Sequence, residues 1–144
     1  MTPRTFLSAA VCGFVLLGCA YPWPRVASTA DCTGNACRVA VSVEELDSRG
    51  CVPDAIPDTL NVRARGAVVI TWEFDTASEY KGYRFPNDGI VFVDASQFEC
   101  ALAEQGKKFV CTDKNTSPGS YKYTINVING PARCTPRDPS VVNN

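Results

Sequence analysis

Apolar and polar residues alternate along most of the chain beyond residue 37, with a period of two rather than 3.6. This spacing is typical of β-strands that bury one face. In the clearest segment, residues 68–74, every second side chain is large and apolar, as in a strand inside a sheet. Other segments with strand character are 39–43, 60–64, 83–85, 89–93, 98–103, 108–112 and 120–128. We therefore expect about seven or eight strands.

Turn-forming residues separate these segments. Glycine stands where a turn needs a positive φ in 86–89, 105–106 and 117–120. The best candidates for a helical turn are 44–48 and 96–103, and no segment reads as a helix that crosses between strands. The pattern predicts an all-β fold, an antiparallel Greek-key β-sandwich that forms one domain over residues 37–144.

The first residues have the layout of a secretion signal. Arg4 precedes an apolar run over residues 6–17, which is shorter than the roughly 20 residues of a membrane-spanning helix. The run ends in Leu16-Leu17-Gly18-Cys19, which resembles the lipobox of bacterial lipoproteins. The resemblance implies that residues 1–18 are removed, that Cys19 carries lipid and that the protein is anchored in the bacterial cell envelope.

Two other interpretations of this segment remain open. Gly18 and Ala20 also provide the small residues of an ordinary cleavage site after Ala20, and the run could stay uncleaved as an anchor. Residues 19–36 carry two prolines and no apolar period, so we expect a tether. Under the lipobox interpretation, Ala20 directly after the lipidated cysteine favours the outer membrane.

Six cysteines follow Cys19, an even number in an exported chain, and this predicts three disulfides. A metal site is less consistent with their wide spacing and with the absence of histidine from the sequence. Six cysteines allow 15 pairings. Local geometry favours one bond across a hairpin, one around a tight Gly-Asn turn, and a third between the two that remain. These pairs are Cys100–Cys111, Cys32–Cys37 and Cys51–Cys134.

The charge pattern gives no sign of a nucleic-acid partner. Residues 1–18 contain Arg4 and no acidic residue, so removing them leaves 13 basic residues from 14, against 15 acidic residues. The basic residues are scattered, and Lys107-Lys108 is an isolated pair.

Two segments of the second half are similar to the cupredoxin family. They are Gly66-Ala67-Val68-Val69-Ile70-Thr71-Trp72 and Pro118-Gly119-Ser120-Tyr121-Lys122-Tyr123-Thr124-Ile125-Asn126-Val127. The resemblance implies a cupredoxin-like or immunoglobulin-like sandwich. It does not extend to copper, because Ile125 and Ile128 stand at the positions of two ligands and a blue-copper site needs imidazoles.

The tail sequence Asp138-Pro139-Ser140-Val141 resembles a motif of small, uncharacterised cupredoxin-like proteins. The other interpretation is an Asp-Pro turn that closes the last edge of the sheet. Neither resemblance supplies an active site, and we expect no cofactor.

Catalytic chemistry has few candidates in this sequence. Without histidine, no Ser-His-Asp or Cys-His arrangement can form. The acidic groups Glu44-Glu45-Asp47 and Glu73-Asp75-Glu79 could provide the carboxylate pair of a glycan-cleaving enzyme, but outward strand positions and loops explain them as well. Asp54, Asp58 or the pair Asn87-Asp88 could offer oxygen to calcium, without a recognisable ligand spacing. We expect a protein that is not an enzyme.

Residues 75–85 are the best candidate for a binding loop, because aromatic and arginine side chains carry much of the energy of protein interfaces. The candidate contact residues are Tyr80, Lys81, Tyr83 and Arg84. In the alternative, Tyr83 and Phe85 begin an inward-facing strand and Tyr80 alone is exposed.

The sequence therefore predicts a non-catalytic envelope lipoprotein that binds a protein or a glycan. A lysozyme inhibitor is a second possibility, because residues 117–121 loosely echo the Ser-Gly-x-x-Tyr loop of such inhibitors. A carboxylate-based glycan-cleaving enzyme is a third.

Overall fold

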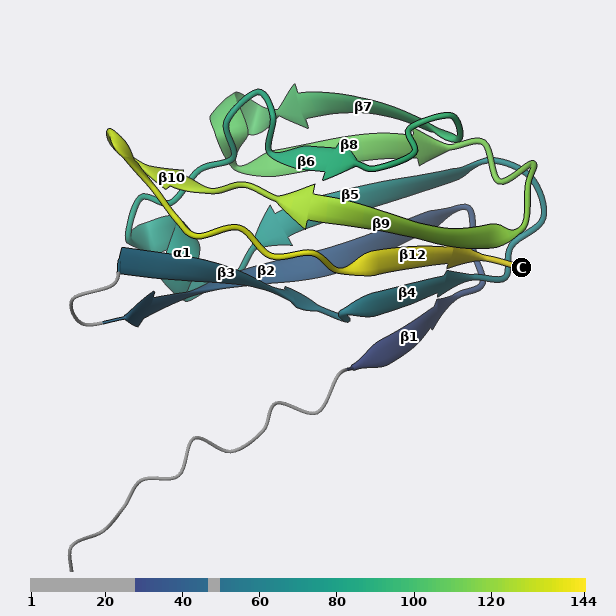
Figure 1. The fold of residues 1–144 in the computed structure, drawn as a ribbon, viewed down its shortest axis with the longest axis horizontal. Coiled ribbons are helices and arrows are strands. Elements are labelled where there is room, and N and C mark those ends of the chain that lie inside the picture. Colours follow the sequence, from purple (N-terminus) through teal and green to yellow (C-terminus); the bar gives the residue numbers. More distant parts are fainter. Residues whose placement is uncertain (1–27, 47–49) are drawn as a thin grey trace, which may run out of the picture.

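The computed structural model describes residues 28–46 and 50–144. The signal segment, Cys19, the first half of the expected tether and Asp47 lie outside the described residues. Two five-stranded sheets face each other across one core (Figure 1). The expected all-β sandwich is therefore confirmed.

The first sheet has the strand order β1-β4-β12-β9-β6. β4 lies parallel to both β1 and β12, whereas β9 is antiparallel to β12 and β6. The bounds of its strands are β1 Thr29–Cys32, β4 Thr59–Val62, β6 Ile90–Phe92, β9 Gly119–Ile125 and β12 Ser140–Asn143.

The second sheet has the strand order β3-β2-β5-β8-β7. β2 and β5 are parallel, and the other neighbours are antiparallel. The bounds are β2 Ala36–Leu46, β3 Gly50–Ile56, β5 Val68–Phe74, β7 Phe98–Ala103 and β8 Lys108–Asp113.

Short elements complete the described part of the chain. α1 covers Thr76–Tyr80, a 3-10 turn η1 covers Glu104–Gly106, and β10 (Ile128–Asn129) pairs with β11 (Ala132–Arg133). Figure 1 places α1 at one end of the sandwich, where β5 finishes, and β10 lies at the same end. Neither helical segment has the length and apolarity needed to cross a membrane.

The core forms where the alternation predicts it. Val68, Ile70, Trp72 and Phe74 of β5 are buried, and every second residue of β9 from Tyr121 to Ile125 is buried opposite them. Trp72 Nε1 donates a hydrogen bond to the Tyr123 hydroxyl at 3.0 Å, and the two rings meet edge to face. The core thus joins the sheets through aromatic contacts and through this buried hydrogen bond.

The structure differs from the expected strand count and direction. The described residues contain twelve strands, and both sheets are mixed rather than antiparallel. The β2–β3 hairpin is followed by a crossing to β4 in the other sheet, and the return to β5 places β5 parallel to β2. β3 contains Pro53, which obscured the strand in the sequence and which an edge strand tolerates.

The sandwich begins earlier in the chain than expected. Thr29–Cys32, within the tether predicted for residues 19–36, forms β1 and pairs with β4 over four residues. The sandwich therefore begins at residue 29 rather than at residue 37. Alternation was not visible there, because the strand is short and three of its four side chains are exposed.

The structure contains three disulfides, in the pairing favoured by the sequence. Cys32–Cys37 joins β1 in the first sheet to β2 in the second. Cys100–Cys111 joins β7 to β8. Cys51–Cys134 joins β3 to the segment that follows β11, across a separation of 83 residues.

Candidate functional site

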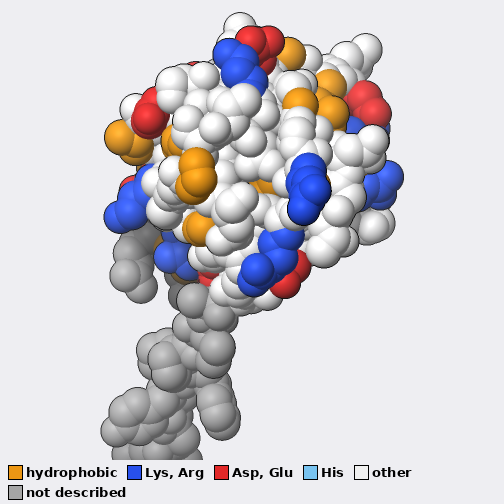
Figure 2. Space-filling view, turned by 90° about the vertical axis from the view of Figure 1, so that its right-hand side faces the viewer, with side chains coloured by type: hydrophobic (Ala, Val, Ile, Leu, Met, Phe, Trp, Pro, Cys, Tyr) orange, Lys and Arg blue, Asp and Glu red, His pale blue; other side chains and the backbone are white. Residues whose placement is uncertain are grey.

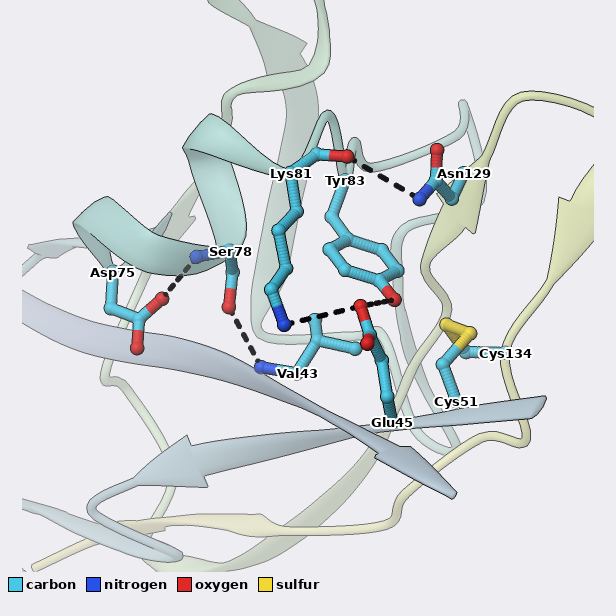
Figure 3. A network of polar contacts seen from close by, with 9 residues as sticks. All are labelled: Val43, Glu45, Cys51, Asp75, Ser78, Lys81, Tyr83, Asn129 and Cys134. Carbon is cyan, nitrogen blue, oxygen red and sulfur yellow. Dashed lines mark hydrogen bonds and ion pairs between the residues drawn. A yellow bond between two sulfur atoms is a disulfide. The ribbon is translucent and has the colours of Figure 1, made fainter. Parts of the chain in front are cut away.

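The predicted binding loop begins with α1, which is attached to β2 by polar contacts (Figure 3). Asp75 caps the helix, because its carboxylate accepts a hydrogen bond from the Ser78 N–H at 2.7 Å. The buried Ser78 hydroxyl accepts a hydrogen bond from the Val43 N–H at 2.9 Å, and the Asp75 N–H donates to the Val41 carbonyl. The start of the loop is therefore held against the sheet.

The position of this helix was not predicted. Residues 44–46 belong to β2 and 98–103 form β7, so the two expected helical turns are wrong over these described residues. The signal that could have located the helix is Asp75, a favoured N-cap residue, three positions before Ser78.

The end of the loop is held by a second set of contacts, centred on Glu45 of β2. Lys81 Nζ lies 3.2 Å from Glu45 Oε1, and the Tyr83 hydroxyl donates to the same oxygen at 3.1 Å (Figure 3). The Asn129 side chain donates to the Lys81 carbonyl at 3.4 Å. The loop is thereby connected to β2 on one side and to β10 on the other.

These contacts shift the pKa values of both Glu45 and Tyr83. The hydrogen bonds from Lys81 and Tyr83 lower the pKa of Glu45, so that its carboxylate form is favoured. Burial, together with the neighbouring Glu45 carboxylate, raises the pKa of Tyr83. Glu45 is therefore the anionic partner that binds Lys81 and accepts the Tyr83 hydrogen bond.

The four predicted contact residues fall into two groups. Tyr80 is 93% exposed, and Lys81 is half exposed although it pairs with Glu45. Tyr83 is only 3% exposed, so its assignment to the binding surface is wrong. Tyr83 and Phe85 face inward, as in the alternative, but they do not begin a strand, and Lys81 is exposed beside Tyr80. Arg84 Nη1 donates to the carbonyls of Tyr83, at 2.6 Å, and Glu79, at 3.3 Å. Tyr83 and Arg84 thus hold the loop that presents Tyr80.

A hollow of about 520 Å³ lies next to the Glu45 contacts. Its lining includes Glu45, Cys51, Tyr83 and Asn129, so two strands, the loop and β10 contribute to it. This volume is within the range of small-ligand sites. The Cys51–Cys134 disulfide and the hydrogen bond from the Thr135 N–H to the Cys51 carbonyl, 2.8 Å long, hold its wall in place.

A second hollow, of about 370 Å³, contains two of the calcium candidates. Asp54 and Asp58 line it with Arg137 and Asp138, and Arg137 Nη2 lies 3.4 Å from Asp54 Oδ1. The third candidate, Asp88, is bound by both Nη atoms of Arg133 at 3.0 and 3.1 Å, and this contact lowers its pKa. Across the described ranges, no three His, Cys, Asp or Glu side chains form a group that could hold a metal ion.

The Asp-Pro segment leads into the interior of a sheet. Asp138 Oδ1 accepts a hydrogen bond from the Thr124 hydroxyl at 2.8 Å, and the Pro139 carbonyl accepts one from the Tyr123 N–H. β12, which follows, lies between β4 and β9. The expectation that this turn closes the last edge of the sheet is therefore wrong.

The carboxylates considered for catalysis are engaged in other contacts. Glu73 pairs with Arg38 at 3.3 Å and lies 3.9 Å from Lys108 Nζ. Asp75 is the helix cap, and Glu79 pairs with Lys107 at 2.7 Å. The roles visible for these side chains are structural.

The segment that echoes a lysozyme-inhibitor loop directs its tyrosine inward. Tyr121 is buried, and its hydroxyl donates to the Ser117 carbonyl at 3.1 Å. In such a loop, exposed groups are needed to reach a partner. This tyrosine instead contacts Phe98 in the core, edge to face.

The candidate site is thus the end of the sandwich where α1, the Glu45 contacts and the 520 Å³ hollow adjoin. Its geometry offers one fully presented aromatic side chain, that of Tyr80, and a hollow lined by both polar and apolar groups. The function of this end has to be inferred from its own residues, because comparison with models of known families and with curated proteins finds no match for the chain.

Proposed function

We propose that the chain is a non-catalytic lipoprotein of the bacterial cell envelope whose β-sandwich binds a protein or a glycan through its α1 end. The observation that carries the proposal is the presentation of Tyr80. Its side chain is 93% exposed, although the residues on both sides of it are held by a helix cap, an ion pair and partly buried hydrogen bonds. An exposed tyrosine on a rigid support loses little conformational entropy when it binds.

The residues around Tyr80 support a role in binding a partner molecule, beyond keeping the surface soluble. Lys81 adds a half-exposed cation, and its partner Glu45 lines the 520 Å³ hollow. Tyrosine supplies both apolar contact and a hydroxyl group, a combination that is enriched in binding hot spots. A protein loop or a sugar ring would satisfy this chemistry.

The proposed compartment rests on the disulfides and on the lipobox-like sequence. Three disulfides in one domain are typical of an exported protein. In the lipobox interpretation of Leu16-Leu17-Gly18-Cys19, the cysteine that would carry the lipid lies ten residues before Thr29, the start of β1. We infer an anchor in the outer membrane, from Ala20 after this cysteine.

We further infer that the sandwich is a metal-free relative of cupredoxins. The two segments that carry the resemblance form β5 and β9, which lie in opposite sheets. They meet in the core through Trp72 and Tyr123. This pairing supports a common core without implying copper.

Lipidation predicts a specific mature amino terminus. We expect mass spectrometry of the protein from bacterial membranes to find diacylglycerol on Cys19, with residues 1–18 removed. A Cys19→Ala variant should lose the lipid and leave the membrane fraction. An unlipidated start at Tyr21 would refute the anchor, because it would indicate ordinary cleavage after Ala20.

Binding through the loop predicts a large effect of Tyr80→Ala. If Tyr80 is a central contact, its loss should cost about 2 kcal/mol, or roughly 30-fold in Kd. The measurement is capture from detergent-solubilised envelopes by the tagged full chain, followed by titration of the enriched partner. Tyr80 makes no contact that holds the loop, so the variant should keep its fold.

The matched control is Val93→Ala, which truncates another apolar side chain that is 83% exposed, on the segment after β6. This variant should retain the partner. Equal retention by the Tyr80→Ala protein would exclude the loop as the binding site, and the absence of any partner enriched by the wild type would argue against the binding function itself.

A further inference from the structure

Two buried polar side chains meet between the sheets at the end of the sandwich opposite α1. Asp113 is the last residue of β8, and Asn143 is the last residue of β12. Their exposed fractions are 0% and 3%. Figure 2 views the molecule from this end, where charged side chains of both signs are scattered over the surface. Asp113 and Asn143 lie beneath that surface.

Their hydrogen bonds leave two oxygen atoms without a donor. Asp113 Oδ1 accepts hydrogen bonds from the Asn115 N–H at 2.9 Å and from Asn143 Nδ2 at 3.1 Å. Asp113 Oδ2 and Asn143 Oδ1 have no partner, and among the described residues they are the buried side-chain nitrogen or oxygen atoms in this state. A buried acceptor without a donor costs about 1–3 kcal/mol.

An ionised aspartate cannot satisfy this pair. A carboxylate and an amide oxygen are both acceptors, whereas a protonated carboxyl group carries one O–H donor. We propose that Asp113 is protonated in the folded protein, and that its Oδ2–H donates to Asn143 Oδ1. The two side chains then form a carboxylic acid–amide pair with two hydrogen bonds, and this pair joins β8 of one sheet to β12 of the other.

The surroundings of Asp113 favour the neutral form. Burial raises the pKa of its carboxyl group, and the hydrogen bonds from Asn115 and Asn143 oppose this only in part. Val68 of β5 and Phe98 of β7 are its neighbours across the strands. No charged side chain of the described residues is among the causes of the shift.

The nearest elements do carry charged groups, and most of these pair with each other. Glu99 of β7 pairs with Lys114 at 3.1 Å, and Glu73 of β5 lies beside Lys108 at the far end of β8. Asp31 of β1 pairs with Arg63, next to β4, at 2.8 Å. Lys122 of β9 is exposed. A charge on Asp113 would therefore be buried without a compensating cation.

The proton links folding to pH. An unfolded aspartate ionises near its ordinary pKa of 3.8, whereas the folded group keeps its proton to higher pH. Between these two values Asp113 binds more protons in the folded state than in the unfolded state, so its contribution to stability falls as the pH rises, by up to tenfold in the unfolding equilibrium constant per pH unit. Above the folded pKa the decline stops, and the contact between the sheets loses its second hydrogen bond.

The direct test is the ¹³C resonance of the Asp113 carboxyl group in the full-length chain, followed by NMR from pH 3 to 8. We expect it to keep the protonated position after the carboxyl groups of Asp31, Asp88 and Asp94 have ionised, since their contacts lower their pKa values. A resonance that moves with these three would overturn the proposal and would indicate a buried water or cation as the missing partner of the two oxygens.

The second test is Asp113→Asn, which replaces the proposed O–H with an amide N–H and cannot ionise. We expect this variant to lose the part of the pH dependence that Asp113 contributes, so that its unfolding equilibrium constant is lower than that of the wild type at pH 8. The control is Asp138→Asn, at an exposed carboxyl group that accepts a hydrogen bond from Thr124. The proposal would be overturned if the stability of Asp113→Asn changed with pH in the same way as that of the wild type. It would also be overturned if the variant were less stable than the wild type at every pH.

Discussion

Replacing both Cys51 and Cys134 with alanine is expected to lower the free energy of unfolding by about 4 to 5 kcal/mol. The disulfide closes a separation of 83 residues, so its loss releases a long loop in the unfolded chain. It also removes the covalent link between β3, at the edge of its sheet, and the segment after β11. Urea unfolding followed by tryptophan fluorescence measures the difference from the oxidised wild type.

The matched control is the removal of Cys100 and Cys111, which are 11 residues apart. The same reasoning gives about 2 to 3 kcal/mol for this shorter loop. Each double variant replaces two cysteines and leaves the other two disulfides in place. Equal losses of stability, or a larger loss for the shorter loop, would contradict the argument from loop length.

Truncating Trp72 to alanine is expected to cost about 3 to 5 kcal/mol, because it opens a cavity where the two sheets meet. Trp72 is fully buried, and it contacts both Phe92 and Tyr123 edge to face. Its loss also removes the donor that binds the Tyr123 hydroxyl at 3.0 Å. Equilibrium unfolding by circular dichroism measures the effect without relying on the tryptophan that is removed.

Trp72→Phe separates the two parts of this effect. It keeps most of the apolar volume and leaves the buried Tyr123 hydroxyl without its donor, at a cost of about 1 to 3 kcal/mol. The double variant with Tyr123→Phe should recover part of that cost, because both hydrogen-bonding groups are then absent. If the double variant is no better than the sum of the two single variants, the Trp72–Tyr123 hydrogen bond contributes nothing to stability.

The core could be predicted from the sequence, because a strand that buries one face has an apolar residue at every second position. Val68, Ile70, Trp72 and Phe74 are buried as expected. The direction of pairing could not be predicted in the same way, since parallel and antiparallel strands can share one alternation. The parallel pairing of β2 with β5 depends instead on the route of the chain between the sheets.

The candidate site was predicted only in part, because its residues were judged by chemical type. Tyr80 and Tyr83 are the same residue type three positions apart, yet α1 ends at Tyr80 and the next residues turn Tyr83 into the core. The Asp75 cap and the Ser78 contact with β2 decide which tyrosine faces outward. Distant partners such as Glu45 and Asn129 are not visible from the local sequence.

The bond between Cys32 and Cys37 also has a mechanical consequence. If the chain is held at Cys19, as proposed, a pull on the protein enters the domain at β1, which is paired with β4 over four residues at the edge of its sheet. Peeling of β1 would reach Cys32 and stop there, because the disulfide transfers the tension to β2 in the opposite sheet. Under force, β1 would then detach from β4 while the rest of the domain stays folded.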